Sequence, residues 1–92
     1  MFQNLPLVTD ESLVKFLFFN KAESLRRLNR FEEALAAYNT VIAVDKNDAR
    51  AHFKKGITFS KMGNKDSACI SFKIAKDLGD VEAEGEISTS CN

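Results

Sequence analysis

The sequence predicts an all-α protein built from two copies of a helical hairpin. Compared with itself at an offset of 34 residues, the chain aligns apolar with apolar and small with small positions. Within each copy, apolar residues recur three and four positions apart, which is the spacing of one face of a helix. One proline and four glycines in 92 residues leave few breaks, so long helices are favoured over short strands.

The internal repeat depends on eight aligned positions, three of them identical. One such match would be chance, but eight at a single offset indicate a duplicated structural unit. The aligned pairs are Phe19 with Phe53, Lys21 with Lys55, Ala34 with Ala68, Ala22 with Gly56, Leu25 with Phe59, Leu28 with Met62, Tyr38 with Phe72 and Val44 with Leu78.

The first hairpin is predicted as helices over residues 10–28 and 31–44. Asn29, followed three residues later by Glu32, resembles a capping box at the start of the second of these helices. The first helix has Thr9 or Asp10 as its candidate N-cap, and the apolar residues of the pair are Leu13, Phe16, Leu17, Leu25, Leu28, Phe31, Leu35, Tyr38, Val41 and Ile42.

The second hairpin is predicted as helices over residues 49–62 and 65–78. Gly63 and Asn64 supply a tight turn and an N-cap between them, and Gly79 suits a left-handed position after the last helix. The N-cap candidates of the third helix are Asn47 and Asp48, and the apolar residues of the pair are Phe53, Ile57, Phe59, Met62, Ile70, Phe72, Ile74, Ala75 and Leu78.

The two units resemble the tetratricopeptide repeat, whose 34 residues form two antiparallel helices with small and aromatic residues where the helices cross. The resemblance covers about residues 15–82 and is strongest over 30–38. It implies a right-handed superhelical stack and a module that binds other proteins, such as a scaffold, adaptor or co-chaperone. The matching residues are Phe18, Ala22, Leu25, Ala34 and Tyr38, then His52, Gly56, Phe59, Ala68 and Phe72; departures are Lys21 and Lys55 in place of leucine, and Lys46 and Asp80 in place of proline.

The domain organisation follows from these limits. We expect an extended N-terminal segment over 1–9, a helical domain over 10–80 with repeats at about 15–48 and 49–82, and an acidic, polar tail over 83–92. No capping helix is predicted in that tail. The fourth helix is therefore expected to be covered by the N-terminal segment, a second copy of the chain or further repeats.

The charge of the chain is zero overall but unevenly distributed. Residues 12–76 hold thirteen Lys/Arg and six Asp/Glu, a balance of +7, whereas 77–92 hold five acids and no base. We therefore expect that the acidic stretch over 77–92 can fold back onto the basic body. The acids of this stretch are Asp77, Asp80, Glu82, Glu84 and Glu86.

The resemblance implies that the first helix of each hairpin lines a concave groove. Five bases and one acid around apolar side chains suit a partner peptide with acidic residues or a C-terminal carboxylate. Asn20, Arg50 and Lys54 resemble three members of the carboxylate clamp that holds chaperone tails, while the two members from a preceding unit are missing. A solvated basic face is the alternative for each single base. The predicted groove residues are Phe19, Asn20, Arg26, Arg27, Arg50, Phe53, Lys54 and Lys61, together with Phe16, Glu23 and Ile57.

Other classes of function are disfavoured. The single histidine, His52, fits a packing position, and no nucleophile, metal set or phosphate loop accompanies it, so neither an enzyme nor a cofactor is predicted. Nucleic-acid binding would use the bases with Phe16, Phe19 and Phe53, but the bases are spread out. A homodimer is the structural alternative. No apolar run is long enough for a membrane span, and two cysteines without a predicted disulfide suggest a cytoplasmic protein.

Overall fold

The computed structural model describes residues 10–91 and confirms the all-α prediction. Each of the four predicted helices agrees with an observed one to within one residue at either end. No helix in the described part of the chain is long and apolar enough to cross a membrane. The observed helices are α1 (Glu11–Arg27), α2 (Phe31–Val44), α3 (Ala49–Lys61), α4 (Lys65–Asp77) and α5 (Ala83–Ser90).

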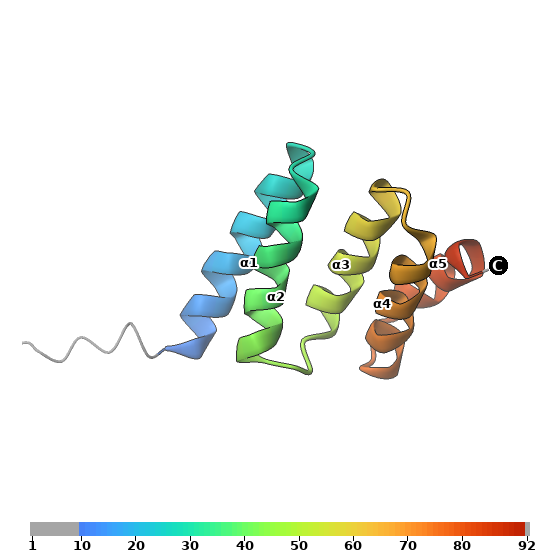
Figure 1. The fold of residues 1–92 in the computed structure, drawn as a ribbon. Coiled ribbons are helices and arrows are strands. Elements are labelled where there is room, and N and C mark those ends of the chain that lie inside the picture. The colour runs from blue at the N-terminus through green and yellow to red at the C-terminus, as the bar shows by residue number, and fades with distance from the viewer. Residues whose placement is uncertain (1–9, 92) are drawn as a thin grey trace, which may run out of the picture.

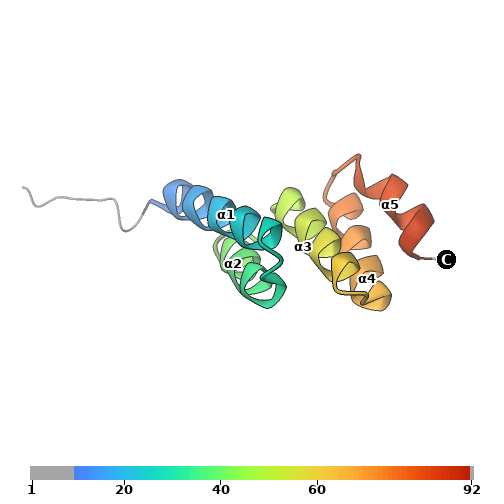
Figure 2. The same cartoon turned by 90° about the horizontal axis from the view of Figure 1, so that it is seen from above.

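The helices form an elongated stack of two antiparallel hairpins (Figure 1). α1 packs against α2 and α3 against α4, and the contact between α2 and α3 joins the hairpins. Seen from above, α1, α3 and α5 form one row while α2 and α4 form the other (Figure 2). This arrangement places the first helix of each hairpin on one side of the stack.

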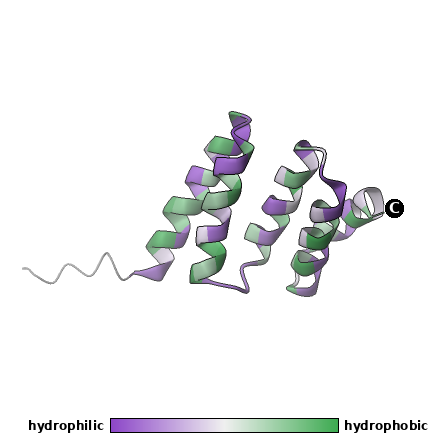
Figure 3. Ribbon diagram, viewed as in Figure 1, coloured by the Kyte–Doolittle hydropathy of each residue, from purple (hydrophilic) through white to green (hydrophobic). Residues whose placement is uncertain are grey.

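Each hairpin has a core in which a small residue faces an aromatic one. Ala22 and Tyr38 are fully buried in the first core, and Phe72 is fully buried beside Gly56 in the second. A Cβ atom at Gly56 would lie 2.5 Å from the Phe72 ring, so only glycine permits this approach. The hydropathy colouring shows apolar segments on all four helices of the two hairpins (Figure 3).

The turns after α1, α3 and α4 share one conformation. Asn29, Gly63 and Gly79 have φ angles of 64°, 82° and 103°, and the next residue donates its N–H to a carbonyl five residues back. This is the Schellman arrangement, which satisfies carbonyls at a helix end. The predicted capping box at Asn29 is therefore wrong. Asn29 closes α1, and Arg30 is the N-cap of α2 without a side-chain capping bond.

Three other capping predictions agree with the structure. Asp10, Asp48 and Asn64 each accept hydrogen bonds from backbone N–H groups two or three residues further along. The alternative cap Thr9 lies outside the described residues, and Asn47 does not cap α3. Short polar side chains at these positions fix where the helices begin.

The two lysines that depart from the repeat pattern lie beside aromatic rings. The Lys21 ammonium is 5.6 Å from the centre of the Phe18 ring, and that of Lys55 is 6.0 Å from the centre of the Phe59 ring. Burial lowers the pKa of Lys55 below its ordinary value. The long aliphatic part of lysine thus takes the place of leucine while the charge faces a ring.

The C-terminal segment corrects two predictions. The segment expected as a polar tail forms α5, which packs on α4 and buries Ala83 and Ser90. A disulfide between Cys69 and Cys91 ties the end of α5 to α4, although the sequence predicted none. The cysteines consequently give no support to the cytoplasmic location expected from them. The N-terminal segment proposed as a cover lies outside the described residues.

Candidate functional site

A groove between α1 and α3 brings together side chains from both repeats. It has a volume of about 550 Å³ and is lined by residues of α1, of α3 and of the N-cap of α3. Five of the eight predicted binding residues line it: Phe19, Asn20, Arg27, Arg50 and Lys54. The other lining residues are Glu23, Ser24 and Asp48.

The remaining three predicted residues have other positions. Arg26 is largely buried and directs its guanidinium toward Tyr38 rather than the groove. Phe53 is only 5% exposed, and its ring centre lies 5.6 Å from that of Phe72 in the core of the second hairpin. Lys61 is the last residue of α3 and does not line the groove. Helical phase alone did not separate the groove side of a helix from its core side.

Glu23 is the centre of a partly buried polar network at the groove floor. Its carboxylate accepts hydrogen bonds from Tyr38 Oη at 2.5 Å and from Arg26 Nη2 at 2.7 Å, while Lys54 Nζ lies 3.9 Å away. Burial favours the protonated acid, but these donors outweigh it and hold the pKa of Glu23 below its ordinary value. Burial, followed by the bond to Glu23, raises the pKa of the Tyr38 hydroxyl. Glu23 is thus ionised and already bound.

Arg50 is held by acids that follow α4. Its Nη1 lies 3.1 Å from Asp80 Oδ2 and 2.8 Å from Glu82 Oε1, and its guanidinium also lies over the Phe53 ring. The Asp80 side chain is only 2% exposed. Two of the acids expected to fold back therefore reach a predicted groove base. Arg50 is not the free cation that the sequence suggested.

A matching contact occurs in the first repeat. Lys15 Nζ lies 2.8 Å from Asp45 Oδ2 and 3.2 Å from Asp48 Oδ2. In both repeats, a base near the start of the first helix is paired with acids that follow the second helix. These pairs fasten the loop to the hairpin, which is a structural role for Arg50.

The groove retains a smaller set of available donors than predicted. It contains three bases and two acids, compared with the five bases and one acid expected. Arg27 is exposed, and no acidic side chain among residues 10–91 forms an ion pair with it. Asn20 donates one amide hydrogen to the Phe16 carbonyl at 2.8 Å and is otherwise exposed. Arg27, Asn20 and the Lys54 ammonium are consequently the groups that can meet a partner.

Asp48 is the acid that the groove prediction missed. It is the N-cap of α3 and pairs with Lys15 while its side chain borders the groove. The sequence contained a signal for the position of Asp48, because an N-cap residue lies at the same end of the helix as Arg50 in the first turn. The sequence identified the cap but not its place in the groove.

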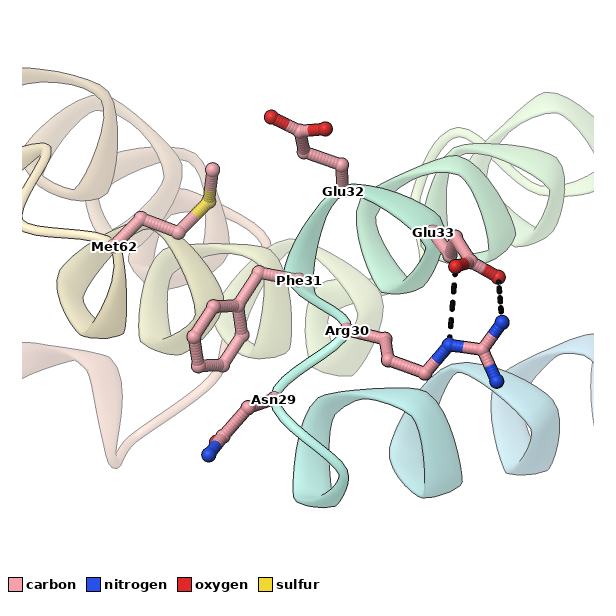
Figure 4. Close-up of a pocket in the computed structure, with 6 residues that line it drawn as sticks. All are labelled: Asn29, Arg30, Phe31, Glu32, Glu33 and Met62. Carbon is pink, nitrogen blue, oxygen red and sulfur yellow. Dashed lines mark hydrogen bonds and ion pairs between the residues drawn. The ribbon is translucent and has the colours of Figure 1, made fainter.

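A second hollow lies at the tips of the hairpins. It has a volume of about 340 Å³ and is bordered by Phe31 and Met62, with Arg30 and Glu33 joined by two hydrogen bonds of 3.0 and 2.9 Å (Figure 4). Phe31 and Met62 come from different repeats, whereas Arg30 and Glu33 bind each other within one repeat. This hollow offers no unpaired base, unlike the groove.

The described part of the chain shows neither a metal-binding cluster nor an exposed row of aromatic rings for nucleic acid. Residues 10–91 contain no group of three or more His, Cys, Asp or Glu side chains placed to hold a metal ion. The aromatic residues that the disfavoured nucleic-acid alternative would use also form no exposed row. Phe53 is buried, and the Phe19 ring packs edge-on against Tyr38 with 5.7 Å between centres.

Comparison with known proteins identifies the repeat. Residues 22–63 match the family model of the TPR repeat. The chain carries the tetratricopeptide repeat. Over 67 residues it is 33% identical to the human and mouse proteins named DnaJ homolog subfamily C member 7, covering 73% of this chain and 14% of each relative. TPR repeats are protein-interaction modules, and the chain spans only a small part of the relatives it matches.

Proposed function

We propose that this TPR chain acts as an adaptor that binds an acidic peptide segment of a partner protein in the α1–α3 groove. The observation that carries the proposal is the position of Arg27, Asn20 and Lys54 on one open groove formed by two repeats. No catalytic step is part of the proposal, since the groove offers binding groups rather than a nucleophile and base.

A carboxylate is the ligand group that these donors suit best. Arg27 presents an unpaired guanidinium, which can bind a carboxylate through two parallel hydrogen bonds. Asn20 on α1 adds an amide to the groove, and Lys54 on α3 adds an ammonium. A side-chain acid and a C-terminal carboxylate share this chemistry, so both sources need to be compared.

An apolar anchor would accompany the acid. Phe19 lines the groove beside these donors, and Phe16 on the same helix is 64% exposed. A peptide with one large apolar residue next to its acids would cover both rings and gain the burial of apolar surface. This combination favours a short extended segment over a uniformly acidic surface.

A chaperone tail is one form of such a peptide. Asn20 and Lys54, two of the three clamp-like residues, line the groove, and the Lys54 ammonium forms a long ion pair of 3.9 Å with Glu23. Arg50, the third, is held by Asp80 and Glu82. The relatives carry a DnaJ name, which is consistent with a co-chaperone role. We infer that this half clamp holds a single carboxylate, in the cytoplasm that the sequence suggested.

The experiment is a binding titration with a fluorescent acidic peptide that ends in a free carboxylate and contains one leucine. Arg27→Glu is expected to lower the affinity at least tenfold, because a lost charge-assisted contact is worth about 1.5–3 kcal/mol. Lys61→Glu is the matched control, since it makes the same change of charge on α3 outside the groove. An amidated peptide separates the terminal carboxylate from the side-chain acids.

Equal losses in the Arg27 and Lys61 variants would show that net charge alone attracts the peptide. Unchanged binding of Arg27→Glu would place the site elsewhere. Weaker binding of the amidated peptide alone would assign the contact to the chain terminus.

A further inference from the structure

At the first end of the stack, none of the residues 10–91 covers an apolar face of α1. Leu13, Leu17 and Leu28 are 39%, 55% and 66% exposed. Their spacing places them on one side of the helix, opposite the buried Ala22. These three leucines are called the outer face of α1. They do not belong to the groove, whose α1 residues are Phe19, Asn20, Glu23, Ser24 and Arg27.

The repeat itself indicates what this face is built to contact. At an offset of 34 residues, Leu17 corresponds to Ala51 and Ser24 to Thr58. Ala51 and Thr58 are both fully buried on α3, the helix that packs against α2 of the preceding hairpin. Leu17 is therefore the counterpart of a residue that the second helix of a hairpin covers, whereas Leu13 and Leu28 correspond to Asn47, which precedes α3, and to Met62, which is 38% exposed.

At the other end of the stack, α4 is the second helix of a hairpin, and α5 already covers it. α5 follows α4 as α3 follows α2, packs on it, and lies in the same row as α1 and α3 (Figure 2). α5 buries little apolar surface on α4, because Ala83 is its fully buried hydrophobic residue and Ile87 is only partly buried. The disulfide from Cys69 to Cys91 supplies a covalent hold at its far end.

The side-chain sizes suit a contact between α4 and a second α1. Val41 on α2 and Ala51 on α3 are both fully buried, and these two helices form the contact that joins the hairpins. Their counterparts at the two ends of the stack are Ala75 on α4 and Leu17 on α1. The larger residue is on the second helix in the pair Val41 and Ala51, and on the first helix in the pair Ala75 and Leu17. The combined side-chain volume of the two pairs is nearly the same, and packed interfaces tolerate such exchanges best.

We propose that reduction of the Cys69–Cys91 disulfide allows the outer face of α1 from a second copy to replace α5 on α4. The copies then stack head to tail, and each new junction continues the α2–α3 interface already present within the chain. Such a contact is heterologous and extends the stack instead of closing a symmetric pair. Of the residues named for this contact, only Ser24 also lines the peptide groove.

The redox step is a two-electron exchange. A dithiol or phosphine reductant donates two electrons to the S–S bond, two protons complete the Cys69 and Cys91 thiols, and the reductant becomes its own disulfide or phosphine oxide, with water supplying the oxygen in the second case. Without the bond, the contacts of α5 include its small apolar contact, the Lys76–Glu84 ion pair, whose atoms are 3.8 Å apart, and the exposed pair between Arg50 and the N-cap residue Glu82. A weakly held terminal helix of this kind is readily displaced.

The test is light scattering coupled to size exclusion over a concentration series of the full chain. The oxidised protein is expected at its monomer mass of 10.3 kDa at every concentration. After phosphine treatment, the mass should rise with concentration. The Cys69→Ser, Cys91→Ser double variant should show the same rise without reductant, and circular dichroism would verify that α1 to α4 remain folded.

Two variants distinguish this contact from general stickiness. Leu17→Glu should keep the reduced chain monomeric, whereas Met62→Glu, which changes an exposed apolar residue at the end of α3, should leave the assembly intact. A reduced chain that stays monomeric overturns the proposal. So does assembly that persists in Leu17→Glu, or that is the same in the oxidised and reduced chains.

Discussion

Tyr38 donates a 2.5 Å hydrogen bond to Glu23 across the first hairpin, and the second hairpin replaces this polar pair with the apolar pair Phe72 and Ile57. Both aromatic rings are fully buried at the same position of the repeat. The same hairpin fold thus contains a polar pair at the helix crossing of the first repeat and an apolar pair at that of the second. The polar version has a further contact, since Lys54 approaches Glu23 from the second repeat.

Removal of the tyrosine hydroxyl should weaken the first hairpin. In Tyr38→Phe the carboxylate of Glu23 loses a donor inside a partly buried site, and we expect a loss of about 1–3 kcal/mol in the free energy of unfolding. The measurement is chemical denaturation followed by circular dichroism. Phe72→Tyr is the reciprocal control, and it should also destabilise because it introduces a hydroxyl beside Ile57.

The combined change should recover part of this loss. Glu23→Ile with Tyr38→Phe installs the pair found in the second hairpin, so the double variant should lose less stability than the sum of its single changes. Additive losses would show that Tyr38 and Glu23 act independently, which the hydrogen bond between them contradicts.

Acid should destabilise the chain through Glu23. The folded pKa of Glu23 lies below its ordinary value, so its contribution is complete above about pH 4.3. That contribution is lost as the pH falls through the folded pKa, where the carboxylate must take up a proton. Between about pH 5 and pH 3, Glu23→Gln should therefore lose less of its own stability than the unmodified chain. Denaturation midpoints along this pH range provide the measurement, and parallel curves would contradict it.

The repeat and its helices could be predicted because they depend on local patterns. The pairs Ala22 with Gly56 and Tyr38 with Phe72 are visible at one sequence offset, and they form the two helix crossings in the structure. Periodic apolar residues and caps such as Asp48 fixed the helix ends. These features need no knowledge of distant contacts.

The parts that could not be predicted depend on contacts between distant segments. α5 is short and contains Gly85, so its helix is selected by packing on α4 and by the bond from Cys69 to Cys91. Likewise, the pairing of Arg50 with Asp80 depends on how the loop after α4 returns to α3. Helical phase also placed Phe53 at a groove, although its ring packs against Phe72.

Gly56→Ala should destabilise the second hairpin although alanine is the better helix former. The new Cβ would lie 2.5 Å from the Phe72 ring, and such overpacking costs about 1–3 kcal/mol, more than the gain in helix propensity of about 1 kcal/mol. Gly85→Ala is the matched control in α5, where nothing lies within 4 Å of the new atom. That variant should gain stability. Thermal unfolding of both variants would decide, and a stabilised Gly56→Ala would refute the close contact.

Asn29 should tolerate glycine but not alanine. Its φ of 64° lies in the left-handed region, where a residue other than glycine or asparagine loses about 1–2 kcal/mol. Asn29→Ala should therefore lower the free energy of unfolding by about this amount, whereas Asn29→Gly restores the residue used at Gly63 and should be nearly neutral. If Asn29 acted as an N-cap for α2, Asn29→Ser would be nearly neutral, because serine caps helices as well as asparagine. In the left-handed conformation Asn29→Ser should instead lose about as much as Asn29→Ala, and urea denaturation of these variants separates the two roles.

Arg50→Gln should affect stability more than peptide affinity. The change removes the cation beside Asp80, whose side chain is only 2% exposed, so the buried carboxylate keeps its backbone bond from Glu82 but loses its charged partner. We expect a loss of about 1–3 kcal/mol in the free energy of unfolding. At a temperature where the variant remains folded, its affinity for the acidic peptide should fall less than that of Arg27→Glu, because Arg50 is already held by Asp80 and Glu82. Calorimetric binding and denaturation of both variants provide the comparison. A larger affinity loss at Arg50 than at Arg27 would mean that the peptide displaces these acids, and the carboxylate would then bind at the start of α3.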